Sequence, residues 1–422
     1  MNYQETIEFI HGIPWMGKKL GLEQIGELLS LMDNPQDNLK FIHVAGTNGK
    51  GSICEMTASI LQSAGYKVGL NISPYINRFN ERIQINHRPI GDDELTDVIG
   101  YIKNLIPCMQ NPPSEFEVIT AAAFKYFSDK KCDYVVLEVG MGGRLDATNI
   151  IKTPLAAVIA TISLDHTKHL GNTIREIAYE KAGIIKPGGL VAAYGQAGDA
   201  AEVFEQVCRQ RGASLVFSNF SKIKALGEDE EYQYFSYKNS GRYALPLYGE
   251  HQLKNAATVL EAIDLLRQKG VGISEKAVEQ GFKASRWPGR FEILSRDPLF
   301  IADGGHNPEG AAAAVETMKK KYPGKQAIIL TGMTEGKAVG ENLEIIDEIA
   351  AGYVIIQSDS KRAVDKQILY ELAAGFGKPA ETADSITEGI ERALELKKPE
   401  QAVLAIGSLY YLGDVREYFG RK

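Results

Sequence analysis

Long apolar runs are missing from this sequence, and none of its apolar stretches approaches the roughly 20 residues that a membrane-spanning helix needs. We therefore expect no membrane contact. The first residues, 1–6, carry charge without a long apolar core, so we expect no signal peptide. These features predict a cytoplasmic protein, and we expect it to be monomeric.

Cysteine is also scarce, with four residues in a chain of 422. Cys54, Cys108, Cys132 and Cys208 are not paired at the spacing of metal ligands, and they are typical of reduced, mostly buried thiols. We expect Cys54 to be a packing residue. The sequence has no polybasic block, and its net charge of −7 argues against broad nucleic-acid binding. Any phosphate contacts must therefore be local.

The sequence does contain a regular alternation of β-type and helical patterns. A chain of this length, with 44% hydrophobic residues, is too long for one ordinary core and suits two domains. The first series of predicted strands covers 41–45, 67–72, 134–139, 156–161 and 190–193. Predicted helices between them include 53–64, 93–105, 117–127 and 174–182. Such alternation predicts a mostly parallel sheet covered on both faces, with ligands at the carboxyl ends of its strands.

The pattern changes near residue 215. Short strands at 232–237 and 242–247 predict a small antiparallel excursion over 215–247, and a helix follows at 252–268. Turn chemistry at 285–290 and Asp297-Pro298 place the predicted domain boundary between 296 and 297. The second series then predicts strands at 299–302, 327–330, 353–356 and 402–405, with helices at 309–321 and 386–396. We expect domains at 1–296 and 297–422, the second being smaller, α/β and Rossmann-like.

The most informative stretch runs from Gly46 to Ser52, between a predicted strand and a predicted helix. Its glycines let backbone N–H groups approach an anion, and the helix dipole favours negative charge there. Lys50 can neutralise phosphate oxygens, and the Ser52 hydroxyl can reach a magnesium ion. The predicted nucleotide contacts in this loop are Thr47, Asn48, Gly49, Lys50, Gly51 and Ser52.

The spacing of this loop departs from the common P-loop. Val44 stands where that motif has its first glycine, and Gly51 separates Lys50 from Ser52. The alternative interpretation is an ordinary Gly-rich turn between a strand and a helix. The strand before and the helix after favour nucleotide binding, so we predict a P-loop-type first domain.

Two further strand ends carry polar side chains. The strand at 134–138 ends in Glu138, whose carboxylate can hold magnesium or a water bound to it, and Gly140–Arg144 follows directly. His166 follows the strand at 156–161 and can ligate a metal or contact phosphate. The alternatives are a solvent-facing glutamate and a structural histidine. The common sheet edge with Lys50 favours the functional interpretation.

Two stretches are less specific. Lys181 and Lys186 lie near a helix C-terminus, where lysines complement the dipole, and nothing in the residues themselves distinguishes one from the other. Asp303, two glycines and His306 end the first strand of the second domain before a proline-led helix. Such a turn can contact a nucleotide or can simply be a well-capped connection.

Taken together, these motifs make the chain closely resemble the folylpolyglutamate synthase and dihydrofolate synthase family, whose members are Mur-type ATP-dependent amide ligases. The motifs that carry the resemblance are 46–52, 73–75, 80–83, 114–117, 137–149, 164–166, 180–185, 287–290 and 303–308. They occur in family order and span both predicted domains.

The resemblance implies roles for individual residues. It implies that the protein uses ATP and two Mg²⁺ ions as cofactors, with a monovalent cation as a possible third. The implied metal ligands are Ser52, Ser73, Glu138, His166 and Lys181. Lys181 matches a lysine that is carbamylated in the family, which turns a cation into an oxygen ligand. The implied nucleotide contacts outside the loop are Asn255, Arg290 and Asp303. His306 matches a histidine near the phosphates and joins Lys50 and Lys181 as a catalytic residue. The folate should lie near Pro74, Arg82, Phe116 and Arg144.

Two loops of the second domain depart from the family pattern. Residues 332–337 lack the usual lysine–aspartate pair, and residues 358–363 lack the usual proline. These loops are implied to bind the incoming glutamate, so the acceptor contacts cannot be transferred from the family. The sequence also does not choose between dihydropteroate and tetrahydrofolate.

The predicted activity is ATP-dependent addition of L-glutamate to a folate or to dihydropteroate, through an acyl phosphate. The nearest alternative is a peptidoglycan-precursor ligase, which usually has an extra N-terminal domain for its uridine nucleotide, whereas only about forty residues precede the loop here. A nucleotide switch is the other alternative. The sequence contains no Asn-Lys-x-Asp phrase, which argues against a GTPase of that kind.

Overall fold

The computed structural model describes residues 1–14, 21–238, 240–334, 338–358 and 362–421. They form two compact units, Met1–Pro246 with Leu253–Ser285, and Leu247–Gln252 with Arg286–Lys422. The second unit thus begins before the predicted boundary between 296 and 297. The reason is that β12 (Glu292–Arg296) pairs antiparallel with β13 (Leu299–Asp303), so Asp297-Pro298 is a hairpin turn within that unit.

An eight-stranded sheet forms the centre of the first unit, in the order β4-β3-β2-β5-β1-β6-β7-β8. The chain enters it after α1 (Tyr3–Gly12) and α2 (Glu23–Leu31), two helices that the sequence interpretation did not include. The strands are β1 (Phe41–Ala45), β2 (Val68–Asn71), β3 (Ile83–Ile85), β4 (Arg88–Pro89), β5 (Tyr134–Glu138), β6 (Ala156–Ile159), β7 (Leu190–Ala193) and β8 (Ser214–Phe217). In the spatial order β2-β5-β1-β6-β7-β8, all neighbouring strands pair in parallel, as predicted. The two edge strands β3 and β4 pair antiparallel.

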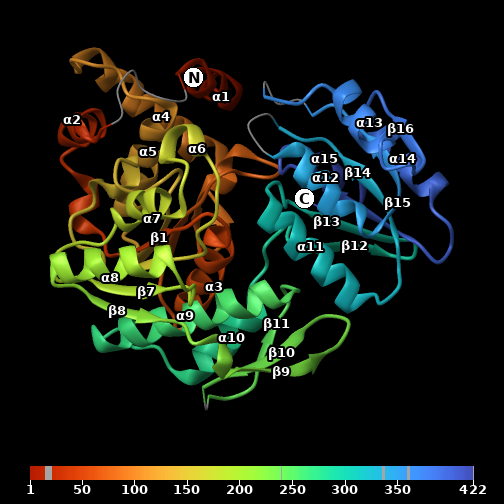
Figure 1. The fold of residues 1–422 in the computed structure, drawn as a ribbon. Helices are drawn as coiled ribbons and strands as arrows, with labels where there is room; N and C mark the ends of the chain where they lie inside the picture. The colour runs from red at the N-terminus through yellow and green to blue at the C-terminus, as the bar shows by residue number, and fades with distance from the viewer. Residues whose placement is uncertain (15–20, 239, 335–337, 359–361, 422) are drawn as a thin grey trace. The chain divides into compact units, whose positions relative to one another are not determined.

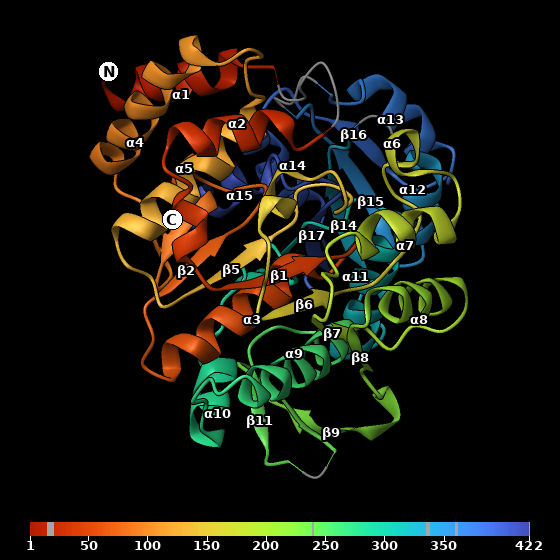
Figure 2. The same ribbon diagram turned by 90° about the vertical axis from the view of Figure 1, so that its left-hand side faces the viewer.

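Helices cover both faces of this sheet (Figures 1 and 2). In Figure 2, α3 (Lys50–Ser63), α9 (Glu250–Gln268) and α10 (Glu275–Ala284) lie below it. The other helices of the unit are α4 (Asp92–Leu105), α5 (Glu115–Asp129), α6 (Thr167–Leu170), α7 (Ile174–Ala182) and α8 (Asp199–Arg211). Helix α3 begins at Lys50, earlier than predicted, because the Gly-rich loop leads directly into the first helical turn.

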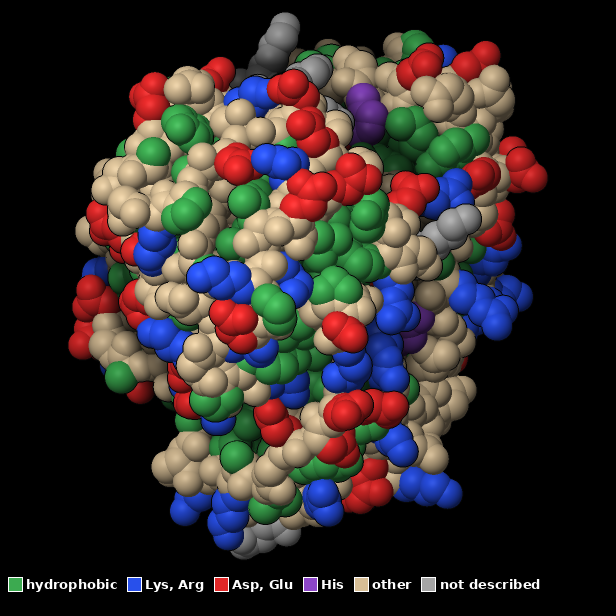
Figure 3. Space-filling view, turned by 90° about the vertical axis from the view of Figure 1, so that its right-hand side faces the viewer, with side chains coloured by type: hydrophobic (Ala, Val, Ile, Leu, Met, Phe, Trp, Pro, Cys, Tyr) green, Lys and Arg blue, Asp and Glu red, His purple; other side chains and the backbone are tan. Residues whose placement is uncertain are grey.

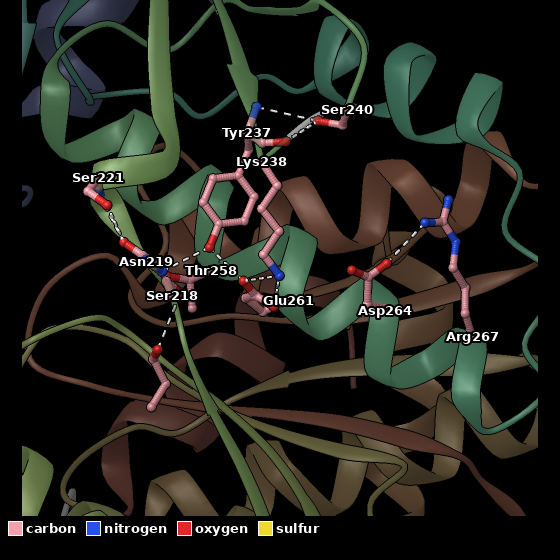
Figure 4. Close-up of polar contacts among 11 residues, drawn as sticks. Ser218, Asn219, Ser221, Tyr237, Lys238, Ser240, Thr258, Glu261, Asp264 and Arg267 are labelled. Carbon is pink, nitrogen blue, oxygen red and sulfur yellow. Dashed lines mark hydrogen bonds and ion pairs between the residues drawn. The ribbon is translucent and has the colours of Figure 1, made fainter.

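A separate three-stranded antiparallel sheet consists of β9 (Ile223–Glu228), β10 (Gln233–Tyr237) and β11 (Tyr243–Leu245). The predicted excursion is therefore present, but its predicted start near residue 215 is wrong, because β8 pairs in parallel with β7. Buried Glu261 of α9 accepts a hydrogen bond from the Tyr237 hydroxyl at 2.5 Å, and it forms an ion pair with Lys238 at 2.8 Å (Figure 4). These contacts tie the small sheet to α9.

The second unit has a six-stranded sheet in the order β12-β13-β17-β14-β15-β16. Its remaining strands are β14 (Ala327–Thr331), β15 (Ala350–Ile355), β16 (Ala380–Thr382) and β17 (Ala402–Ile406). Its helices are α11 (Pro308–Lys321), α12 (Val339–Asp347), α13 (Lys366–Ala374), α14 (Ile386–Leu396) and α15 (Leu412–Tyr418). All pairs except β12–β13 are parallel, which confirms a second α/β sheet of Rossmann type.

Candidate active site

The loop from Gly46 to Ser52 is fastened to the segment that follows β6. The backbone N–H of Thr47 donates to Thr161 O at 2.7 Å, and the N–H of Asn48 donates to Thr161 Oγ1 at 3.3 Å. The Thr47 hydroxyl in turn lies 3.1 Å from the N–H of Ser163. The N–H groups of Thr47 and Asn48 therefore hold the shape of the loop. The N–H groups that begin α3 come next, at the positive end of the helix dipole, where an anion is favoured.

Gly49 is the residue at which this loop turns into α3. Its φ is +84°, a left-handed value that L side chains rarely adopt. A Cβ atom there would lie 2.7 Å from Oδ1 of Asn255, which comes from α9. The structure thus brings Asn255, a predicted nucleotide contact, directly against the loop.

Two lysines donate to one carbonyl of the loop. Lys50 Nζ lies 3.2 Å from Gly46 O and 3.1 Å from Thr47 O, and Lys181 Nζ lies 2.7 Å from Gly46 O. Lys181 is buried, whereas Lys186 is half-buried and donates to Asn149 O. The tertiary structure therefore distinguishes the two lysines that the sequence left equivalent, and it is Lys181 that reaches the loop.

The carboxylate of Glu138 lies at the end of β5, beside β1. Its Oε2 accepts a hydrogen bond from the N–H of Ser73 at 2.8 Å, which joins two predicted metal ligands from β5 and from the segment after β2. Ser52 and Glu138 are both buried. Burial raises the pKa of the Cys54 thiol. The charge of Glu138 raises this pKa further, whereas the charge of Lys50 lowers it, so both charged groups act on one buried position of α3.

His166 is the predicted metal ligand with the least support from local geometry. It has a left-handed φ of +50° and is the residue that precedes α6. Its N–H donates to the Asp165 carboxylate at 2.8 Å, and its side chain is 38% exposed. It shares the carboxyl edge of the sheet with Glu138, since β6 and β5 flank β1.

The predicted folate residues lie in two groups. Buried Arg82 lies over the rings of Tyr75 and Phe79, at 5.4 and 5.5 Å from their centroids, and Tyr75 directly follows Pro74. Burial raises the pKa of nearby Glu115, although the charges of His11 and Arg82 act against this. Phe116 follows Glu115 at the start of α5.

Arg144 forms the second group with α7. It donates to the Glu180 carboxylate at 2.9 Å, and its backbone N–H donates to Glu180 O at 2.8 Å. The predicted substrate role of Arg144 would therefore compete with an existing ion pair.

The predicted residues of the second unit gather at the end of β13. Asp303 is buried and accepts hydrogen bonds from the N–H groups of Phe291 and Gly305, both at 2.7 Å. Burial raises the pKa of Asp303, while the charge of Arg290 acts against this. His306 Nδ1 lies 2.9 Å from Gly304 O. The parts of the two unusual loops at 335–337 and 359–361 lie outside the described residues.

Sequence reasoning assigned no role to Thr161, Ser163, His43 or Asp146. The first two hold the loop at 46–52, and the last two belong to a buried chain of hydrogen bonds. A signal was present for His43, because it is the one polar residue within the apolar run 41–45. For Thr161 and Ser163 no local pattern indicates which loop they contact.

Comparison with known proteins identifies the family. The Mur ligase middle domain matches residues 44–263, and the Mur ligase glutamate ligase domain matches residues 289–409. The chain belongs to the Mur ligase family. It is 35% identical to the dihydrofolate synthase/folylpolyglutamate synthase of Bacillus subtilis, over 98% of each chain. It is 34% identical to the folylpolyglutamate synthase of Lacticaseibacillus casei, over 99% of this chain and 98% of the other.

A solved structure of a Mur-type ligase shows the same fold over the full length. Folylpolyglutamate synthase of Mycobacterium tuberculosis, complexed with ADP and AMPPCP, superposes with a TM-score of 0.91 at 30% identity. The match covers 100% of this chain and 98% of that one. The resemblance inferred from the sequence is therefore confirmed, as is the mixed α/β fold class. The chain belongs with the folylpolyglutamate and dihydrofolate synthases within the Mur ligases.

None of the described helices is both long enough and apolar enough to span a membrane. Among the described residues, no group of three or more His, Cys, Asp and Glu side chains is arranged to hold a metal ion by itself. Acidic and basic side chains are also intermixed on the face that Figure 3 shows.

Proposed function

We propose that this protein is an ATP-dependent ligase that adds L-glutamate to a folate, to dihydropteroate, or to both. The observation that carries the proposal is its similarity, along nearly the whole of each chain, to enzymes that bear these names. The Bacillus subtilis relative is named for both activities and the Lacticaseibacillus casei relative for one. The acid substrate is therefore a folate, dihydropteroate or both.

The proposed reaction has two steps. A carboxylate oxygen of the folate attacks the γ-phosphorus of ATP, and the bond to the β-phosphate oxygen breaks, which gives an acyl phosphate and ADP. The amine of glutamate then attacks the acyl carbon, loses a proton and expels inorganic phosphate. Activation is required because a free carboxylate is a poor acyl donor. Catalysis by positioning and electrostatics, with no protein nucleophile, is typical of phosphoryl transfer.

The chain's own residues supply the phosphate site. The N–H groups at the start of α3 would bind phosphate oxygens, and Lys50 would exchange its carbonyl partners for the phosphates. Asn255 lies against Gly49 and would contact the nucleotide from α9. We assign Arg290 and Asp303 to the nucleotide and His306 to the phosphates, on the family resemblance.

Residues from α3, from the segment after β2 and from the end of β5 would together hold a magnesium ion. Ser52, Ser73 and Glu138 offer oxygen donors, which Mg²⁺ prefers, and the ion commonly keeps several waters and phosphate oxygens. The lack of a three-residue cluster among the described residues is compatible with such a site. When bound there, Mg²⁺ would supply positive charge against the repulsion between the carboxylate and the γ-phosphate. We assign His166 and carbamylated Lys181 to a second ion, and this remains a proposal.

The test is an ATP-dependent assay with dihydropteroate and with tetrahydrofolate, side by side, each with L-glutamate. We expect ADP release to depend on both the acid and glutamate, with a product heavier by one glutamyl residue. Nucleotide hydrolysis that needs neither substrate would indicate a switch protein. Activity only with a uridine-nucleotide peptidoglycan precursor would favour the other class of Mur ligase.

Positional isotope exchange tests the intermediate separately. Exchange in ATP that depends on the folate carboxylate, without glutamate, is the expected sign of a reversible acyl phosphate. Its absence in an enzyme that turns over would count against that step, once rotation of the β-phosphate has been shown to be free.

A further inference from the structure

Strand β1 is a buried apolar strand with one polar residue, His43. The side chain is fully buried, and Nε2 lies 2.9 Å from Oγ1 of Thr148. Its Nδ1 has no hydrogen-bond partner among the residues that the structure describes. Leaving a buried polar atom unpaired is unfavourable, so packing alone would favour an apolar side chain at this position.

The hydrogen bonds around Thr148 run in one direction. The Thr148 hydroxyl donates its only hydrogen to Asp146 Oδ1 at 2.5 Å, so Oγ1 must accept from His43. The ring proton of His43 is therefore on Nε2. Burial, together with the charge of Lys186, lowers the pKa of His43 to about 3, so the ring is neutral at physiological pH. The donor in β1 thus orients the hydroxyl toward Asp146.

Asp146 holds the turn that follows β5. Its Oδ1 also accepts the N–H of Thr148 at 3.0 Å, and its Oδ2 accepts the N–H of Met141 at 2.9 Å. Burial raises the pKa of Asp146, and its hydrogen bonds to Thr148, Met141 and Gly140 act against this. The carboxylate therefore anchors the backbone two and three residues beyond Glu138.

The anchored turn sets the place of an aromatic ring. A Cβ atom on Gly140 would lie 2.5 Å from Cζ of Phe116, so the ring rests directly on the glycine backbone. A shift of this turn would move the surface against which the Phe116 ring packs. Phe116 is one of the residues assigned above to the folate.

We propose that His43 is a positioning residue for the folate acid. Through Thr148 and Asp146 it fixes the turn at Gly140 and Met141, and through that turn it fixes the ring of Phe116. The inference rests on the proposed function and deepens it, because it adds a residue to the substrate-positioning machinery that does not touch the substrate.

Three variants of the full chain separate positioning from packing. His43→Leu removes the donor and keeps an apolar side chain of similar size. His43→Gln carries an amide nitrogen at the ε position and can again donate to Thr148. His43→Asn carries its amide one bond closer to the backbone and serves as the polar control that does not reach. For His43→Leu and His43→Asn we expect KM for the folate acid to rise about tenfold, as for loss of one buried hydrogen bond, with KM for ATP unchanged. His43→Gln should recover most of this loss.

If His43→Leu does not fold, Thr148→Val replaces it in the test. The Thr148→Val substitution removes the hydroxyl at nearly constant side-chain volume. The double variant His43→Leu/Thr148→Val should be no worse than Thr148→Val alone, because both act through one chain. Equal rises in KM for ATP and for the acid, additive effects in the double variant, or no recovery by His43→Gln would each overturn the inference.

The ring state of His43 can be measured without activity. In ¹⁵N-histidine-labelled wild type, the resonance that disappears in His43→Gln should show a neutral ring protonated on Nε2, with no titration between about pH 5.5 and 8. A titrating ring, or a proton on Nδ1, would overturn the hydrogen-bonded chain. A wild type that ligates no folate acid would overturn the proposed function and this inference together. An active wild type with an unchanged KM in His43→Leu would overturn the inference alone.

Discussion

Lys50 and Lys181 donate to the same acceptor, the carbonyl oxygen of Gly46, at 3.2 and 2.7 Å. One lysine comes from the first turn of α3 and the other from the last turn of α7. The carbonyl of Gly46, which directly follows β1, is therefore the point at which the loop at 46–52 is bound to both helices. Substitution of either lysine should therefore affect the loop, but the two substitutions should change ligase activity in different ways.

Lys50→Ala should abolish ligase activity, with kcat/KM falling by about a hundredfold or more, as for loss of a charge that stabilises the transition state. The fold should persist, because Lys181 still holds Gly46 O. Initial rates and the thermal midpoint of the variant check the two parts of this prediction. Turnover close to wild type would contradict the role assigned to Lys50.

Lys181→Ala should also lose activity, but a small added carboxylate such as acetate should restore part of it. The reason is that the proposed carbamate supplies oxygen atoms, which a free carboxylate can replace in the space left by the side chain. The matched control is Lys186→Ala, whose lysine contacts Asn149 O instead of the loop and whose rate should not respond to acetate. A Lys181→Ala enzyme that works at the wild-type rate without acetate argues against carbamylation.

Gly49→Ala should raise KM for ATP, and Gly65→Ala should not. Both glycines have left-handed φ values, +84° and +92°, so both substitutions should cost about 1 kcal/mol of unfolding free energy. Only at Gly49 would the new Cβ meet a neighbour, Asn255, at 2.7 Å, whereas nothing lies within 4 Å at Gly65. Equal KM values for ATP in the two variants would remove Gly49 and Asn255 from the nucleotide site.

His87 should stabilise the fold more at low pH than at high pH. Its Nδ1 lies 3.1 Å from buried Glu55, and its Nε2 lies 3.1 Å from Ser59 Oγ. Burial alone would lower the pKa of His87, but the hydrogen bond and charge of Glu55 raise it overall. A raised pKa means that the contribution is complete below the unfolded-state value of about 6.5 and disappears as the pH rises through the folded-state value.

Urea unfolding of wild type and His87→Gln at pH 5.5 and pH 8.5 measures this contribution. The difference in unfolding free energy between the two proteins should be larger at pH 5.5 than at pH 8.5. A difference that is the same at both pH values would show that the pair carries no proton-linked stability.

Local patterns predicted the parts of the fold that depend on local chemistry. The strand at 41–45 and the helix at 174–182 have the predicted bounds, because buried parallel strands are continuous apolar runs and capped amphipathic helices have clear ends. The pairing of β8 was wrong because β-type residues between turns do not reveal whether their partner is parallel. Helices α1 and α2 were not predicted, although Asn2 and Glu5 form a capping box at the start of α1.

The sequence by itself determined the mixed α/β fold class, the strand, Gly-rich loop and helix at 41–63, and the family, since these depend on residue types at fixed spacing. Only the tertiary structure decided that Lys181, and not Lys186, reaches Gly46, that the N–H of Ser73 binds Glu138, and that His43 is linked to Asp146 through Thr148. Each of these contacts joins segments that are far apart in the chain, or depends on the direction of a buried side chain. Local residue patterns carry no such information, because it arises when strands that are distant in the sequence pair side by side.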